Sequence, residues 1–277
     1  MALEQLRGTI ITPAFHRFFK THEAQMWRMD DMRFDQIDRG LLTEDEIVAV
    51  RGAMLVESHN PVYTQVLLDY FRHDHEMAAF IVTWSYEELK HYLALRTYLE
   101  ATGMVDLVDL EKELTETRAG PWGDDERNFT APQSFAYTML QEEITGLFYH
   151  GFAQRTKEPT LKRMLQIIGK DEYRHCQWYL YKGKKSLQHN PQALEEVDDL
   201  LLRFRMPGPS FMKEYDRYGA AMFRQIPSAI NSGRQVMSKL KDLVGFGHML
   251  RLAADSRYRN KLSEEWGVDL KKLVGLG

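Results

Sequence analysis

Apolar positions recur along this chain with the period of an α-helix, and no segment shows the alternation of a strand. Thr43 and Glu46 form a capping box, which predicts the start of a helix that carries Glu57. A polar interruption at residues 72–75 predicts a turn, and the return helix is expected to end near Gly103. The first part of the chain is therefore predicted to form a helical hairpin.

The same pattern is repeated further along the chain. Thr130 and Gln133 form a second capping box, which opens a long helix after an expected loop at residues 119–129. Pro159 predicts a break, because the residue before a proline avoids the α conformation, and a fourth helix then runs over about 160–187. These signals predict a second hairpin.

Further helices are predicted after the second hairpin. Asn190 and Pro191 start a fifth helix that ends before Pro207, and two or three more helices are expected within residues 210–277. No domain boundary is indicated, so we predict one all-α domain over residues 1–277.

Candidate metal ligands occupy matching places in the two hairpins. Glu88 and His91 form a Glu-x-x-His step, and so do Glu172 and His175. Residues three apart share a helix face, so each step presents an oxygen and a nitrogen ligand side by side. Glu57 precedes Glu88 by 31 residues, and Glu142 precedes Glu172 by 30. A lone Glu on two helices and Glu-x-x-His on two others is the ligand set of a ferritin-like di-iron four-helix bundle.

The positions of the predicted turns, more than the number of Glu-x-x-His steps, support a metal site. With 22 glutamates and 10 histidines, about one Glu-x-x-His step is expected by chance. The two predicted turns, however, fall midway between Glu57 and Glu88 and midway between Glu142 and Glu172. Antiparallel folding of each hairpin therefore brings its two carboxylates to the same height. The prediction is a ferritin-like bundle core that binds two iron ions, followed by additional C-terminal helices.

Some of these assignments have competing readings. Any single Glu is more often a solvated surface residue than a metal ligand. In addition, Glu87 and Glu143 are adjacent to Glu88 and Glu142, so either member of each doublet could be the ligand. His91 selects Glu88, while the hairpin symmetry slightly prefers Glu142 over its neighbour. Pro61 is expected to open or kink the helix at Glu57, because it has no N–H for the Glu57 carbonyl.

Three further residues are candidates for roles beside the metal. Asp171 is expected either to accept a hydrogen bond from a ligand His or to pair with Arg174. Trp84, one turn before Glu88, is either a wall of the metal pocket or plain core. The hydroxyl of Thr145 faces either metal-bound oxygen or its own helix backbone. The segment from His73 to Glu76 is interpreted as a solvated turn.

Composition excludes several classes of protein. No apolar run is long enough to span a membrane, the N-terminus has no signal region, and nucleic-acid motifs are absent. The single cysteine, Cys176, excludes an internal disulfide and suits the cytoplasm, and we expect it to be a buried structural thiol. Residues 203–277 carry 14 Lys and Arg against 7 Asp and Glu. This basic region could receive an acidic partner or be an ordinary surface.

The residues around the ligands resemble the soluble acyl-acyl carrier protein desaturases, the plant stearoyl type and its bacterial relatives. The segments that carry the resemblance surround Glu57 with Pro61 and Tyr63, Trp84 to His91, Tyr137 to Thr145, and Asp171 to His175. The resemblance covers roughly residues 45–215, with familial residues again near the C-terminal end. It implies a homodimeric, ferritin-like di-iron enzyme that inserts a double bond into an acyl chain on acyl carrier protein.

The resemblance also implies O2 as co-substrate, a ferredoxin-type electron donor and a role for Thr145 in oxygen activation. Two residues depart from the plant pattern: Gly146 replaces a bulky aromatic residue, and His150 falls one position late. A di-iron oxygenase, either a hydroxylase or an N-oxygenase, is the alternative enzyme. Iron storage or peroxide scavenging is disfavoured, because 277 residues far exceed a minimal four-helix subunit.

Overall fold

The computed structural model describes residues 11–118, 129–226, 228–266 and 269–275. Within these ranges every regular element is helical, which confirms the all-α prediction. The chain packs into two compact units. The first unit comprises the described parts of residues 1–123, 156–167 and 208–222. The second unit comprises the described parts of residues 124–155, 168–207 and 223–277. No helix in the described ranges is long and apolar enough to cross a membrane.

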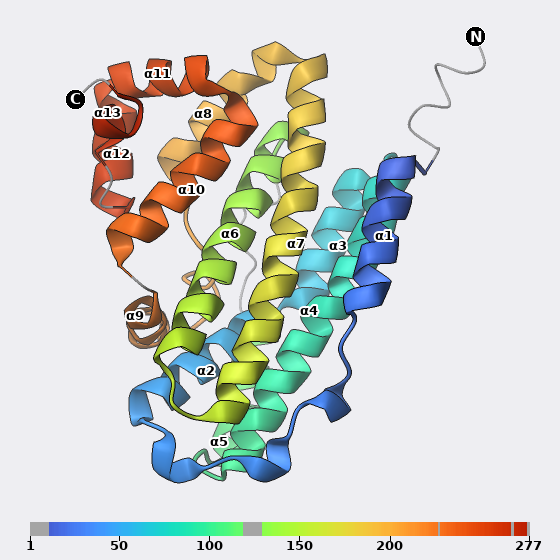
Figure 1. Cartoon of the computed structure of the whole chain (residues 1–277), viewed down its shortest axis with the longest axis vertical. Helices are drawn as coiled ribbons and strands as arrows, with labels where there is room; N and C mark the ends of the chain where they lie inside the picture. The colour runs from blue at the N-terminus through green and yellow to red at the C-terminus, as the bar shows by residue number, and fades with distance from the viewer. Residues whose placement is uncertain (1–10, 119–128, 227, 267–268, 276–277) are drawn as a thin grey trace. The chain divides into compact units, whose positions relative to one another are not determined.

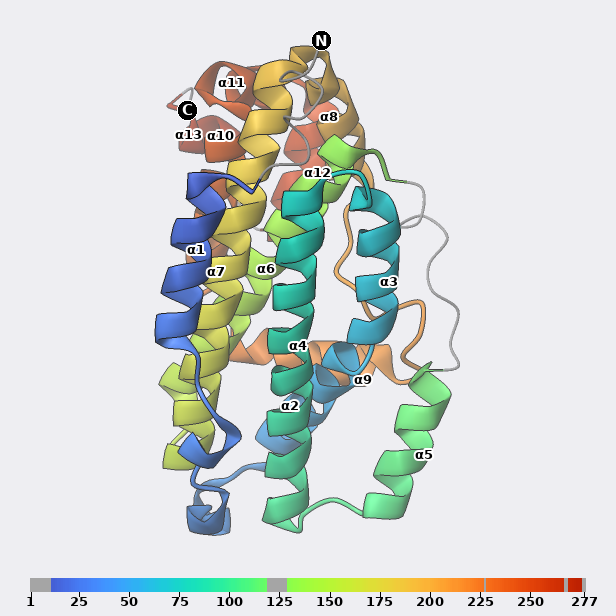
Figure 2. The same ribbon diagram turned by 90° about the vertical axis from the view of Figure 1, so that its right-hand side faces the viewer.

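The first unit is organised around one long helix, α4. The elements in chain order are α1 (Pro13–Gln25), η1 (Met29–Asp31), η2 (Phe34–Gln36), η3 (Arg39–Leu41), α2 (Glu44–Glu57), α3 (Asn60–Phe71), α4 (His75–Thr102) and α5 (Leu107–Arg118). Both α2 and α3 pack against α4, and Figure 2 shows α3 running alongside it. The unit is thus the first predicted hairpin, with its outgoing arm divided into two helices.

The ends of these helices follow the predicted signals. Thr43 and Glu46 form the reciprocal bonds of a capping box at the start of α2. The side chain of Asp74 accepts a hydrogen bond of 3.0 Å from the backbone N–H of Met77 and so caps α4. Gly103 ends α4 with a φ of 58°, a conformation that glycine adopts without strain.

The predicted distortion at Pro61 is a complete break between two helices. The last residue of α2 is Glu57, Ser58 forms its C-cap, and α3 begins at Asn60 with Pro61 in its first turn. Pro61 has no N–H with which to continue the hydrogen-bond ladder from α2. Glu57 consequently lies at a helix terminus.

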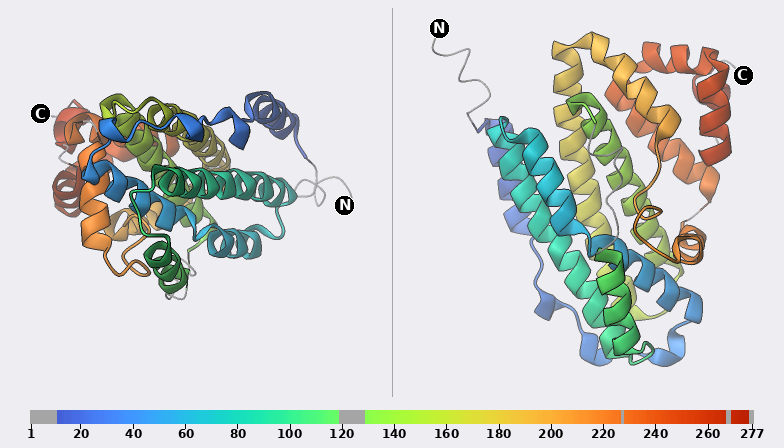
Figure 3. Two further views of the ribbon diagram at one scale, coloured as in Figure 1. Left: turned by 90° about the horizontal axis from the view of Figure 1, so that it is seen from below. Right: turned by 180° about the vertical axis from the view of Figure 1, so that it is seen from behind.

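The second unit contains the second hairpin and a C-terminal cluster of helices. Its elements are α6 (Ala131–Arg155), α7 (Pro159–His189, in this unit from residue 168), η5 (Pro191–Ala193), α8 (Leu194–Arg203), α10 (Ala229–Val244), α11 (Phe246–Ala254), α12 (Ser256–Trp266) and α13 (Leu270–Leu273). Figure 1 shows α6 and α7 side by side. The helices α8, α10, α11 and α12 pack on one another, as Figure 3 shows.

The hairpin limits agree with the sequence prediction, since α6 begins at Ala131, with Thr130 and Gln133 forming its capping box, and α7 begins at Pro159. Two expectations were wrong. The part of residues 210–277 that the structure describes forms five helices, α9 (Tyr215–Gln225) to α13, rather than two or three. Glu76 is buried instead of solvated, and it accepts hydrogen bonds from Thr12. Most of the predicted loop, residues 119–128, lies outside the described residues.

Candidate metal centre

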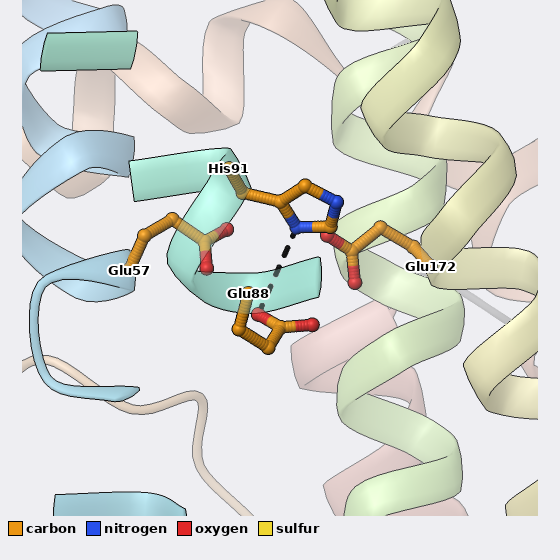
Figure 4. Close-up of side chains that lie close together, drawn as sticks. All are labelled: Glu57, Glu88, His91 and Glu172. Carbon is orange, nitrogen blue, oxygen red and sulfur yellow. Dashed lines mark ion pairs between the residues drawn. The ribbon is translucent and has the colours of Figure 1, made fainter. Parts of the chain in front are cut away.

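The first unit brings three predicted ligands together, and we call Glu57, Glu88 and His91 the first triad. Glu57 comes from the end of α2, and the other two come from α4. One ligand atom from each residue lies within 4.8 Å of the others. Figure 4 shows these side chains, with Nδ1 of His91 3.8 Å from the carboxylate of Glu88. All three are buried, so the triad is an internal polar cluster and not a surface charge group.

Aromatic side chains enclose the first triad within its own unit. The ring of Trp27 lies parallel to that of His91, with 3° between the planes and 6.4 Å between the centroids. The buried Lys90 donates a hydrogen bond of 2.6 Å to the backbone carbonyl of Trp27, and its Nζ lies 4.0 Å from the ring centroid. Trp84 is buried one turn before Glu88. The ring of His91 is therefore packed against an aromatic side chain whose backbone carbonyl is held by Lys90.

The neighbouring Glu87 has a separate partner. Its carboxylate lies 3.1 Å from Nδ1 of His22 on α1, and both side chains are buried. The contact directs Glu87 toward α1, whereas Glu88 lies with His91. Glu88, and not Glu87, is therefore the carboxylate that lies in the cluster with His91.

The second unit holds a matching second triad of Glu142, Glu172 and His175. These residues come from α6 and α7, and one ligand atom from each lies within 4.8 Å of the others. Nδ1 of His175 lies 3.3 Å from Glu142 and 3.9 Å from Glu172. All three side chains are at least 98% buried. Each unit therefore contains two carboxylates and one imidazole in the same order along the chain.

Glu143, the other half of the second doublet, belongs to a different cluster. Its carboxylate accepts a hydrogen bond of 3.4 Å from the thiol of Cys176 and lies 3.8 Å from Nζ of Lys239. Burial raises the pKa of Glu143, and Lys239 opposes part of that rise. Burial, together with the nearby Glu143, raises the pKa of the Cys176 thiol. Cys176 is thus a buried protonated thiol, as predicted.

Asp171 and Thr145 make local contacts. Asp171 accepts a hydrogen bond of 2.6 Å from Arg174, which is the salt bridge considered from the sequence. The hydroxyl of Thr145 donates to the carbonyl of Gln141 at 2.9 Å, the bond back to the helix that was the other expectation. Its oxygen can still accept a hydrogen bond. Roles of Thr145, Trp84 and Asp171 at a metal remain predictions.

The two departures from the plant pattern lie together between α6 and α7. A Cβ on Gly146 would lie 2.9 Å from the ring of Tyr173, closer than real side chains approach. The same ring meets His150 edge-on, with 5.3 Å between the centroids. Tyr173 on α7 thus fills the space beside Gly146 on α6.

Two features beside the triads were not predicted from the sequence. Trp27 lies far from His91 along the chain, and no local signal indicates their stacking. Asn60 bonds α3 to α4 directly after the Glu57 break. The Asn60–Pro61 pair is a helix-start signal, and it could have indicated that a new helix begins there.

The donor set suits iron. The two triads offer four carboxylates and two imidazoles, all buried. Burying ionised carboxylates costs much free energy unless positive charge compensates them, and two divalent ions would balance four negative charges. Imidazole and carboxylate together are donors that iron accepts. The six residues therefore fit two iron ions.

The basic C-terminal region is less available than its net charge indicates. Arg251 pairs with Asp198, Arg257 pairs with Asp255, and Lys239 lies beside Glu143. These ion pairs neutralise part of the local charge. The C-terminal part of α7 is more uniformly basic: Lys182, Lys184 and Lys185 are half-buried there, and no acidic residue occurs within residues 173–194.

Comparison with known proteins gives consistent matches. A model of the family described as fatty acid desaturase matches residues 19–237. The chain is 26% identical over 187 residues to a protein named acyl-[acyl-carrier-protein] desaturase DesA1 from Mycobacterium tuberculosis, covering 64% of this chain and 55% of that one. It is 30% identical over 179 residues to palmitoyl-[acyl-carrier-protein] 4-desaturase 3 of Ophrys sphegodes, covering 60% and 44%. The chain spans about half the length of these relatives.

Among solved structures, an R2-like ligand-binding oxidase reconstituted with a Mn/Fe cofactor is similar. The TM-score is 0.53 at 18% identity, and the match covers 94% of this chain and 93% of the other. At this identity the likeness concerns the fold alone, and it confirms the all-α, ferritin-like fold class.

Proposed function

Because the chain belongs to the fatty acid desaturase family, we propose that it is a di-iron, O2-dependent desaturase that introduces a double bond into an acyl chain carried on acyl carrier protein. The observation that carries the proposal is the pair of buried triads, each with two carboxylates and one imidazole. Two relatives are named for acyl groups on acyl carrier protein, which supports the same substrate class here.

In this proposal Glu57, Glu88, His91, Glu142, Glu172 and His175 hold the two ions. Glu88 and Glu172, next to the imidazoles, would each supply carboxylate oxygens to the metal. Bound iron supplies the redox chemistry with O2 that removal of hydrogen from an unactivated methylene pair requires. A methylene pair, O2, two electrons and two protons become an alkene and two waters, with the electrons coming from a ferredoxin-type donor.

The protein's own residues exclude water and fix the geometry. The side chains of Trp27 and Trp84 are both buried and give the first triad apolar surroundings. A dry, rigid site suppresses side reactions and holds the reacting methylene pair in place. Thr145, one turn after Glu142, is the proposed residue for assisting oxygen activation through its hydroxyl.

We propose that the C-terminal part of α7, around residues 182–185, receives the carrier protein. Acyl carrier protein is acidic, and this segment carries three half-buried lysines, of which Lys182 and Lys185 share a helix face. Lys184 follows His175 by nine residues, or about 14 Å along the helix axis at the usual rise. A carrier bound there would have its prosthetic arm within reach of the second triad. Charge complementarity of this kind mainly increases the rate of association.

We also propose that the chain pairs with a second copy through α4. Between residues 76 and 99 the only exposed positions of α4 are Val82, Tyr86, Leu89 and Leu93, and all four are apolar. Their spacing of four, three and four residues is that of a helix-packing seam. In an antiparallel pair centred between Tyr86 and Leu89, those two residues would face one another. The exposed His75 and Glu100 at the two ends of α4 would then lie opposite each other. The apolar face of α4 is therefore complementary to the same face on a second copy of the chain.

The function is tested with the iron-loaded chain, ferredoxin, its reductase and O2 on a panel of acyl-carrier proteins, followed by mass spectrometry. Loss of the mass of two hydrogens from the acyl chain is the expected result. Gain of the mass of one oxygen would instead identify the hydroxylase or N-oxygenase. O2 consumption that does not depend on any acyl substrate would overturn both and favour iron storage or peroxide scavenging.

The metal assignment has its own test. The variants Glu88→Ala and His175→Ala are expected to lose most of their iron, measured as iron per chain after anaerobic loading and desalting. Full iron content in both variants would remove the basis of the proposed site. Val108→Ala is a suitable control, because Val108 is 77% exposed on α5 and far from both triads in sequence.

A further inference from the structure

The first triad contains one ligand whose backbone needs support from outside its own helix. Glu57 is the last residue of α2, while Glu88 and His91 lie in the middle of α4. Residues within a helix are fixed by hydrogen bonds on both sides, but those at its end are fixed on one side only. Pro61 cannot continue the ladder past Glu57. The direction in which Glu57 leaves α2 therefore depends on what holds the residues that follow it.

A small polar network holds the start of α3 against α4, and we call Asn60, Thr64 and Ser85 the polar clamp. Nδ2 of Asn60 donates a hydrogen bond of 2.8 Å to the backbone carbonyl of Ser85. The hydroxyl of Thr64 lies 2.8 Å from Oδ1 of Asn60 and 2.7 Å from Oγ of Ser85. A hydroxyl has one proton and an amide oxygen only accepts, so Thr64 donates to Oδ1 of Asn60 and accepts from the Ser85 hydroxyl.

The clamp is equally close to ligands on both helices. Asn60 follows Glu57 by three residues, and Ser85 precedes Glu88 by three. On α4, three residues are nearly one helical turn, or about 4.5 Å of rise. The hydrogen bond thus joins the Asn60 side chain to the backbone of α4, within three residues of a carboxylate on each side.

An aromatic contact holds the other side of the break. The ring of His59 stacks on that of Phe211, with centroids 3.8 Å apart and 14° between the planes. His59 and Asn60 are both buried. The break after Glu57 is therefore packed on one side and hydrogen-bonded on the other, an arrangement that fixes a turn with no regular ladder of its own.

We propose that Asn60 and Thr64 are positioning residues that set the distance between the carboxylates of Glu57 and Glu88, and so the affinity of the first triad for its metal ion. The proposal rests on the metal centre of the proposed function. Without the clamp the start of α3 can shift. The carboxylate of Glu57 then moves relative to Glu88, although all three ligand residues are still present. Outer residues that orient ligands typically change metal affinity by about 10- to 100-fold.

The test is an anaerobic titration of the full chain, freed of metal, with Fe(II) and separately with Co(II), whose visible absorption reports its ligands. In Thr64→Val and Asn60→Ala we expect one of the two ions to bind about 10- to 100-fold more weakly. The other ion is expected to keep its affinity. The Co(II) spectrum of the weakened site should change in shape, which a general loss of stability would not produce.

Two further variants make the test specific. Thr64→Ser keeps the hydroxyl and is expected to restore the affinity and the spectrum. Thr83→Val is the matched control, because the Thr83 hydroxyl on α4 bonds back to the Ala79 carbonyl of its own helix. Thr83→Val is expected to bind both ions like the natural chain.

Several outcomes would overturn the inference. One is unchanged binding of both ions in Thr64→Val and Asn60→Ala. Another is an equal loss in Thr83→Val, or a loss that Thr64→Ser does not restore. Failure of the proposed function would look different. In that case the natural chain itself would bind fewer than two ions, or would bind two ions and act on no acyl carrier.

Discussion

The carboxylate of Glu142 lies 3.3 Å from Nδ1 of His175. The adjacent Glu143 turns to another side of α6, where it meets Cys176 and Lys239. Neighbouring residues on a helix are about 100° apart around the axis, so only one member of a Glu-Glu doublet can face a given site. This geometry separates a candidate ligand from a residue that supports the fold.

The doublet gives a direct comparison. Glu142→Gln is expected to lower iron affinity at least about tenfold, because it removes a charged donor from the second triad. Glu143→Gln is expected to keep two irons per chain, since its carboxylate contacts a thiol and a lysine. Iron per chain by mass spectrometry after anaerobic loading is the measurement. The reverse result would move the ligand assignment to Glu143.

The contact between Gly146 and Tyr173 predicts an unusual response to alanine. Gly146→Ala should lower the free energy of unfolding by about 1–3 kcal/mol, because the new methyl group meets the tyrosine ring. Gly247→Ala is the control: its Cβ would meet nothing within 4 Å, and alanine there should stabilise α11 by up to about 1 kcal/mol.

Urea unfolding measures both variants, and Tyr173→Ala tests the cause. When Tyr173 is already alanine, Gly146→Ala should cause little or no loss in the free energy of unfolding. The effects of the two substitutions would then not be additive, as expected for residues in contact. Equal costs of Gly146→Ala with and without the ring would show that the two residues do not limit one another.

Tyr98 predicts how stability changes at alkaline pH. Its hydroxyl donates a hydrogen bond of 2.9 Å to the buried Glu158, and burial raises the pKa of Tyr98 far above its ordinary value. The folded chain therefore keeps this proton at a pH where the unfolded chain releases it. The free energy of unfolding should fall above about pH 10, by up to about 1.4 kcal/mol per pH unit from this group.

Tyr98→Phe removes that contribution. We expect it to cost about 1–3 kcal/mol at pH 8, because Glu158 loses a donor, and to show a shallower decline between about pH 10 and 11. Urea unfolding at several pH values gives both quantities. An identical slope in the two proteins would mean that Tyr98 ionises equally easily in the folded and unfolded chains.

The apolar face of α4 predicts a variant with altered assembly. Leu89→Asp should weaken self-association at least about tenfold, since it places a charge at the centre of the proposed seam. Val108→Asp makes the same chemical change at a residue that is 77% exposed on α5 and should leave association unchanged. Sedimentation velocity over a range of concentrations measures both. A natural chain that stays monomeric at all concentrations would exclude the proposed pairing.

The lysines of α7 predict an effect on substrate binding alone. Lys184→Glu with Lys185→Glu should raise KM for the acyl carrier substrate about tenfold or more, with little change in kcat, because the lysines lie outside both triads. Lys162→Glu with Arg163→Glu, at two exposed positions near the start of α7, is the matched double charge reversal. The difference between the two proteins should shrink at high salt. Equal KM values would place the carrier elsewhere.

Local signals predicted the limits of both hairpins well. Thr43, Thr130 and Pro159 act on the backbone within a few residues, so their effect can be read from neighbouring positions. The family resemblance seen around the ligands was confirmed by the match over residues 19–237. The composition of each triad also follows from spacing, because helix periodicity places Glu88 with His91 and Glu172 with His175.

Contacts between distant segments could not be predicted in the same way. Glu76 is buried because Thr12 reaches it from 64 residues away. Glu87 is drawn aside by His22, which lies 65 residues earlier in the chain. Such choices depend on which side chains meet after folding. A single sequence does not show which of several possible partners a side chain will contact.

The close approach of Tyr173 to Gly146 also has an evolutionary consequence. Neither position can acquire a larger side chain alone without a clash, so the two are expected to change together. Relatives with a bulky residue on α6 at this point should carry a small or flexible one at the facing position of α7. The pair would then mark lineages within the family, independently of the ligands that its members share.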